Sequence, residues 1–67
     1  MENTELEKVL ASIDKQIEVF SGFVYKELKE KNKRIDGTYM YQYYEHIIDG
    51  LMIARNTVDL QIELNKE

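Results

Sequence analysis

The sequence predicts an all-α protein, an antiparallel helical hairpin of two long helices that dimerises into a four-helix bundle. Two stretches carry apolar residues at alternating steps of four and three, and one short turn signal separates them. That spacing is typical of the apolar seam of a coiled coil. Because a short connection makes successive helices antiparallel neighbours, we expect one domain over residues 1–67.

The first helix is predicted over about residues 4–34. Thr4 and Glu7 fit a capping box at its start. Its apolar seam consists of Leu6, Leu10, Ile13, Ile17, Phe20 and Val24. Ser21-Gly22 is its weak point, since glycine in a helix interior costs about 1 kcal/mol relative to alanine. Two helices separated there are the alternative, but the seam crosses the site without a change of phase, which favours one helix.

A turn is predicted over about residues 35–38. Asp36-Gly37 supplies a residue that tolerates a positive φ, and Thr38 suits the N-cap of the next helix. The helix before the turn is expected to end with Asn32 in a left-handed conformation.

The second helix is predicted over about residues 39–65. Its seam has the same steps and consists of Met40, Tyr44, Ile47, Leu51, Ala54 and Val58. Tyr41, Ile48 and Met52 widen the apolar arc on one side and Tyr43 widens it on the other, to about 180° of the helix circumference. This surface is larger than one neighbouring helix can cover. Since a lone helix pair of this size is marginally stable, a two-fold homodimer is expected.

The composition excludes several classes of protein. Sixty-seven residues are too few for a large catalytic scaffold. The absence of cysteine excludes a thiol nucleophile, a cysteine-based zinc site and a disulfide framework, and favours a cytoplasmic location. The longest apolar run, residues 51–54, is far short of the ~20 residues that span a membrane. Frequent Lys, Asn, Ile and Glu are typical of a low-GC bacterium, its phage or a plasmid.

An aromatic cluster marks the start of the second helix as a candidate partner or dimer interface. The predicted interface residues are Tyr39, Tyr41, Tyr43, Tyr44, Ile48, Met52, Arg55 and Asp59. Tyrosine and arginine are enriched at the energetic centres of interfaces. Arg55 has Asp59 as an acidic neighbour one turn on, and at an interface it would pair with a carboxylate of a second copy or of a partner. The alternatives are that the tyrosines fill space around the turn and that Arg55 covers an apolar edge with its stem.

A basic block ends the first helix and is a possible patch for an anionic partner. Its cations are Lys26, Lys29, Lys31, Lys33 and Arg34. The alternative is that they stabilise the helix C-terminus and keep the chain soluble. The interleaved Glu27 and Glu30 weaken the local field, and the net charge of −4 makes nucleic acid an unfavourable partner.

Glu45, His46 and Asp49 are spaced to share a metal ion or a proton, but they lie on the polar side of the second helix, where a solvated surface is expected. We therefore predict no catalytic residue, no cofactor and no metal site. The expected function is that of a non-enzymatic protein that binds other proteins, as a regulator, inhibitor or adaptor, and is itself a homodimer. The alternatives are a nucleic-acid-associated dimeric regulator that uses the basic block of residues 26–34 and the tyrosine cluster, whose rings could stack on bases, and a purely structural assembly subunit.

Overall fold

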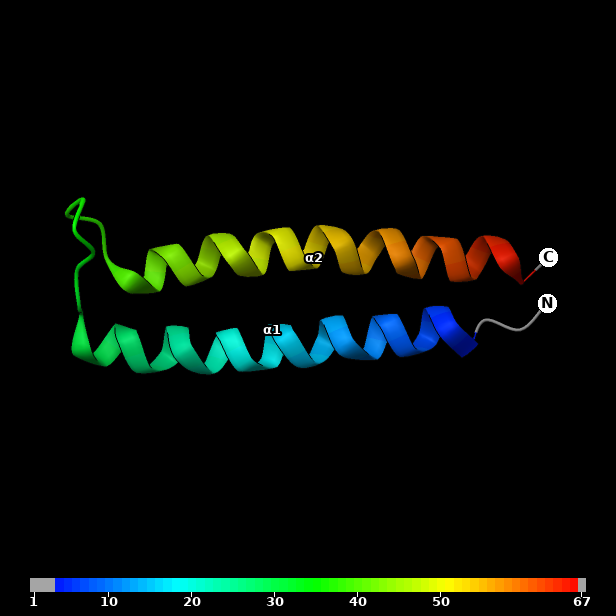
Figure 1. The fold of residues 1–67 in the computed structure, drawn as a ribbon, viewed down its shortest axis with the longest axis horizontal. Helices are drawn as coiled ribbons and strands as arrows, with labels where there is room; N and C mark the ends of the chain where they lie inside the picture. The colour runs from blue at the N-terminus through cyan, green and yellow to red at the C-terminus, as the bar shows by residue number, and fades with distance from the viewer. Residues whose placement is uncertain (1–3, 67) are drawn as a thin grey trace.

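The computed structural model describes residues 4–66. Helix α1 covers Thr4–Glu30 and helix α2 covers Met40–Asn65, and a loop of residues 31–39 joins them. The helices lie side by side and run in opposite directions, with the loop at one end (Figure 1). The predicted helical hairpin is confirmed. It is a flat, elongated body with Cα extents of 48 × 17 × 13 Å.

Helix α1 is continuous, and the alternative of a break at Ser21-Gly22 is wrong. Gly22 is exposed, and a Cβ atom added to it would meet nothing within 4 Å. The glycine therefore costs only conformational entropy here and serves no close packing contact.

Helix α1 ends at Glu30, four residues before its predicted end. Lys31 takes the left-handed conformation with φ of 54°, and its backbone N–H donates a hydrogen bond to the Glu27 carbonyl at 2.7 Å. Lys31, and not Asn32, is thus the residue that terminates the helix. Residues 33–34 consequently belong to the loop.

Replacing Lys31 by glycine is expected to stabilise the protein. The left-handed conformation costs a residue with a side chain about 1 kcal/mol, which glycine does not incur. The melting temperature should rise by about 4–8 °C for a gain of that size. Thermal denaturation followed by circular dichroism measures the shift. Lys29→Gly, inside the last turn of α1, should instead lower the melting temperature, and an equal shift of both variants would contradict this explanation.

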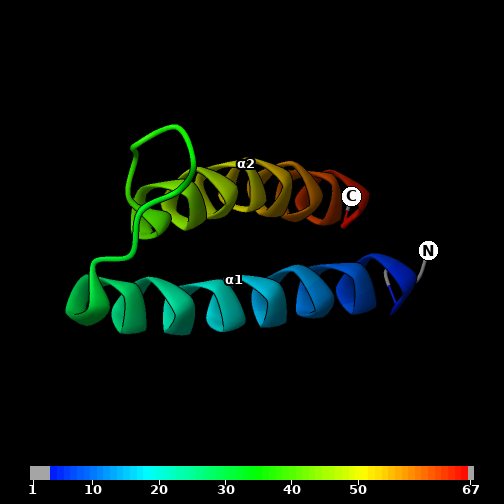
Figure 2. The ribbon, with the colours of Figure 1, turned by 60° about the vertical axis from the view of Figure 1, so that its left-hand side comes forward.

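The loop is held by backbone hydrogen bonds. The Arg34 N–H donates to the Thr38 carbonyl at 2.7 Å, and the Gly37 N–H donates to the Arg34 carbonyl at 3.0 Å. Gly37 has φ of 88°, as the Asp-Gly turn signal predicts. A single antiparallel bridge then pairs Lys33 with Tyr39. Figure 2 shows that the loop rises over the N-terminal end of α2.

Tyr39 is the N-cap of α2, where the sequence predicts Thr38. The Tyr39 N–H donates to the Gln42 side-chain oxygen at 3.2 Å. Gln42, the third residue of the helix, thus supplies a hydrogen-bond acceptor for the backbone N–H of the N-cap residue. The Thr38 hydroxyl is engaged elsewhere, because it donates to Asp36 inside the turn.

The interior of the hairpin is thin. Among residues 4–66, Ile62 is the only buried apolar residue, with 6% of its surface exposed. Most seam residues are half-buried: Leu6, Leu10, Ile13, Ile17, Phe20, Val24, Met40, Tyr44, Ile47, Leu51 and Val58. Ala54 is exposed, and its predicted place in the seam is wrong. The half-buried Arg55 lies against α1 instead, because its side chain reaches a carboxylate there.

Candidate interaction surfaces

Arg55 links the two helices. Its Nε donates to Asp14 Oδ1 at 2.6 Å, and the two side chains are 35% and 48% exposed. The sequence suggests pairing with Asp59 or with a carboxylate across an interface, but the structure pairs Arg55 with Asp14 of the same chain. An accessible pair of this kind contributes about 0–1 kcal/mol, so it aligns the helices more than it stabilises them.

The tyrosine cluster does not form one surface. Tyr44 is half-buried between the helices, where its ring centroid lies 5.9 Å from that of Phe20 and 5.3 Å from that of Phe23. Tyr43 is 40% exposed, and the Arg34 guanidinium lies 4.3 Å from its ring centroid. Tyr44 is therefore a packing residue, which agrees with the space-filling alternative, while Tyr43 is accessible.

Tyr39 and Tyr41 form a stacked pair at the loop end. Their ring centroids are 5.2 Å apart with 21° between the ring planes, and both residues are half-buried. The Lys33 ammonium lies 5.2 Å from the Tyr39 ring centroid. The stack presents an aromatic edge beside the loop.

The other predicted interface residues lie on the side of the hairpin that carries the Arg55–Asp14 pair. We call this side the charged face; its residues are Glu7, Asp14, Tyr41, Glu45, Ile48, Met52, Arg55 and Asp59. Met52 is 48% exposed and Asp59 is exposed. Ile48 is half-buried and, with Ser21 and Val24, lines a shallow hollow of about 240 Å³.

The basic block is divided between α1 and the loop. Lys26 pairs with Glu30 at 3.7 Å on α1, and the Lys29 ammonium lies 4.7 Å from the Tyr25 ring centroid. In the loop, Lys33 and Arg34 lie on tyrosine rings, and Lys31 is the left-handed residue. The cations of the basic block therefore do not form one shared site for an anionic partner.

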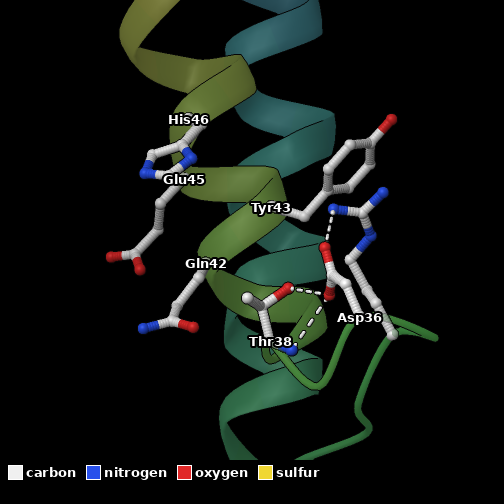
Figure 3. Close-up of a pocket in the computed structure, with 7 residues that line it drawn as sticks. Asp36, Thr38, Gln42, Tyr43, Glu45 and His46 are labelled. Carbon is white, nitrogen blue, oxygen red and sulfur yellow. Dashed lines mark hydrogen bonds and ion pairs between the residues drawn. The ribbon is translucent and has the colours of Figure 1, made fainter.

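A larger hollow of about 540 Å³ lies between the loop and α2 (Figure 3). Its lining residues are Arg34, Asp36, Thr38, Gln42, Tyr43, Glu45 and His46. Arg34 and Asp36 form an ion pair of 3.5 Å on one side. Figure 3 shows Glu45 and His46 pointing away from that pair. A catalytic site requires polar groups that converge on one point. The polar groups that line this hollow do not converge in this way.

The pKa of Asp36 is lowered from its ordinary value of 3.8. The Thr38 hydroxyl donates to Asp36 Oδ1 at 2.7 Å and is the main cause; the Thr38 N–H, at 3.0 Å, and the Arg34 charge add to it. Because the folded pKa is below the ordinary one, ionised Asp36 stabilises the turn above pH ~4. That contribution is lost as the pH falls through the lowered pKa.

Replacing Thr38 by alanine is expected to raise the pKa of Asp36 toward 3.8, because the hydroxyl that stabilises the carboxylate is removed. An NMR titration of the Asp36 carboxyl carbon measures this shift. Thr38→Ser keeps a hydroxyl and should titrate like the parent protein. An unchanged pKa in Thr38→Ala would contradict the assigned cause.

Within residues 4–66, no three His, Asp or Glu side chains are grouped so that they could hold a metal ion. Over the same residues, neither helix combines the length and the apolar character needed to cross a membrane.

One surface was missed in the sequence. It lies opposite the charged face, and we call it the uncharged face. Its residues are Val9, Ser12, Gln16, Val19 and Phe23 of α1 and Tyr43, Ile47, Gly50, Ala54, Thr57 and Gln61 of α2. All are exposed except the half-buried Ile47. The sequence signal for this face is that, on each helix, uncharged residues recur at steps of three and four in a second series beside the apolar seam.

Comparison with known proteins adds no assignment, since no protein-family model, curated protein or solved structure matches the chain.

Proposed function

We propose that this protein acts by binding other proteins, as a non-enzymatic regulator, inhibitor or adaptor, and that its working form is a homodimer. The proposal is based on one observation: the hairpin has many apolar side chains but buries very few of them. Apart from Ile62, every apolar side chain among residues 4–66 is at least partly exposed. Apolar side chains left exposed along both helices support a role in binding another protein.

The same imbalance between apolar surface and burial supports dimerisation. A small domain buries a low fraction of its surface and is marginally stable, and a two-helix hairpin gives each helix only one neighbour. Association of two hairpins into a four-helix bundle gives each helix a second neighbour and extends the apolar core.

A different protein can bind where the dimer leaves accessible apolar and aromatic groups. Met52 and the Tyr39–Tyr41 stack offer such groups at one face and at the loop end. Methionine and tyrosine adapt well to the side chains of a partner helix. Nucleic-acid binding has less support, because the cations of the basic block are divided and several lie on tyrosine rings.

Light scattering over a concentration series, at low and at high salt, tests the homodimer. The chain mass is 8.0 kDa, so a dimer has twice that mass. We expect the dimer mass at micromolar concentration and little effect of salt, because apolar burial is not screened. A mass of one chain at every concentration would refute the homodimer.

A further inference from the structure

We propose that the second copy of the chain packs on the uncharged face of the hairpin. The inference rests on the homodimer proposed above and gives it a specific interface, different from the one that the sequence predicts. Four independent features of the face support it: its spacing, its size, its charge and its open centre.

The spacing of the face matches that of a helix seam. Its residues follow one another at steps of 3, 4, 3, 4 on α1 and 4, 3, 4, 3, 4 on α2. At 3.6 residues per turn, the mean direction of each series lies roughly 90° around the helix from the seam inside the hairpin, and Ile47 belongs to both the seam and the α2 series. In a four-helix bundle each helix contacts two neighbours in about these two directions. Each helix thus carries a second seam, and the two second seams point to the same side of the hairpin.

The face offers apolar groups over a sufficient area. Val9, Val19, Phe23 and Tyr43 are 46%, 39%, 42% and 40% exposed. The broad side of the hairpin measures 48 by 17 Å between Cα atoms, a footprint long and wide enough to hold an interface of the standard size, which buries ~800 Å² of accessible surface per partner.

Charge identifies a second copy as the occupant. Each copy carries a net charge of −4, so two copies approach most favourably through surfaces that bear no charge. Pairing of two charged faces would bury Glu7, Glu45 and Asp59 of each copy, while Arg55 is already engaged with Asp14. Burying carboxylates without partners is unfavourable. Between Val9 and Phe23 on α1 and between Tyr43 and Gln61 on α2, the uncharged face holds no carboxylate, so its burial requires none. The charges nearest to it lie at its ends: Glu5 and Glu30 continue the α1 series, and the Arg34 guanidinium lies on the Tyr43 ring.

The centre of the face is open. Gly50 lies midway along the α2 series, and a Cβ atom added to it would meet nothing within 4 Å. Neighbouring Ala54 is exposed and small. Helix α2 therefore presents its backbone at the middle of the face, where a helix of the second copy can approach closely.

The test compares two substitutions on α2, two residues apart and on opposite faces. Ala54→Asp lies on the uncharged face and Met52→Asp on the charged face, and each adds one negative charge. We expect the dimer dissociation constant, measured by sedimentation equilibrium, to rise at least tenfold for Ala54→Asp and less than threefold for Met52→Asp. Circular dichroism checks that both variants remain helical.

A second measurement applies if Ala54→Asp does not fold. Because the chain has no cysteine, a spin label can be attached at Thr57→Cys on the uncharged face or at Asp59→Cys on the charged face. Pulsed EPR should give the shorter distance between copies for Thr57→Cys.

The outcomes separate this inference from the proposed function. A parent protein that is monomeric at every concentration refutes the homodimer and this interface together. A dimeric parent that is weakened by Met52→Asp but not by Ala54→Asp, or that gives the shorter distance for Asp59→Cys, refutes only the uncharged face. The interface predicted from the sequence would then replace it.

Discussion

Replacing Leu51 by aspartate is expected to abolish the helical fold. Leu51 is half-buried at the middle of the α2 seam. At about 0.05–0.15 kcal/mol per residue, a chain of this length has a free energy of unfolding of only about 3–10 kcal/mol. Loss of a fully buried leucine costs about 2–5 kcal/mol; the half-buried position of Leu51 reduces that figure, and a carboxylate placed against α1 without a partner adds to the cost. Ile17→Asp on α1 should act in the same way.

Ile53→Asp is the matched control for Leu51→Asp. Ile53 is two residues further along α2 and is 69% exposed, on the side away from α1. The same change of chemistry should leave most of the helical signal at 222 nm, because water can solvate the new carboxylate. If Ile53→Asp and Leu51→Asp unfolded the protein equally, the face of α2 that packs on α1 would have been assigned wrongly.

Replacing Tyr44 by alanine is expected to lower the free energy of unfolding by about 2–3 kcal/mol. The Tyr44 ring contacts both Phe20 and Phe23, which themselves pack edge to face at 5.6 Å. Deleting a fully buried aromatic ring costs about 3–5 kcal/mol, and the half-buried position of Tyr44 reduces that figure. Urea denaturation measures the change.

Tyr41→Ala provides the comparison for Tyr44→Ala. Tyr41 stacks on Tyr39 at the edge of the hairpin, and an aromatic pair of this kind contributes about 0.5–1.5 kcal/mol beyond its buried area. The loss should therefore be smaller than that of Tyr44→Ala. A larger loss for Tyr41→Ala would mean that the stack, and not the ring group around Tyr44, stabilises the loop end.

The sequence predicts the hairpin because both seams repeat regularly along the chain. It does not predict the end of α1, since residues 31–34 are all acceptable in a helix. Lys31 terminates the helix because the backbone carbonyl of the next residue, Asn32, is used in the loop. It accepts a hydrogen bond from the Met40 N–H at 2.9 Å. That requirement comes from α2 and cannot be seen in the local sequence.

The candidate surfaces were predicted less well, because they depend on how α2 is rotated against α1. A wheel drawn from sequence places Ala54 in the seam, whereas the structure places Arg55 there, half-buried. Arg55 pairs there with Asp14, which is 41 residues away along the chain. Neighbour rules within one helix cannot find such a partner. The same rotation leaves Tyr43 exposed and Tyr44 half-buried, although their ring centroids are 5.6 Å apart, and it exposes the uncharged face.

The position of the aromatic rings also bears on the order in which the chain folds. Phe23 and Tyr44 meet near the loop and are 21 residues apart, whereas Asp14 and Arg55 are 41 apart. Each doubling of the closed segment adds about 0.6 kcal/mol of entropic cost. Early contacts should therefore form beside the loop, and the helices should then zip toward the end that contains Ile62. That end would be the last to form and the first to open.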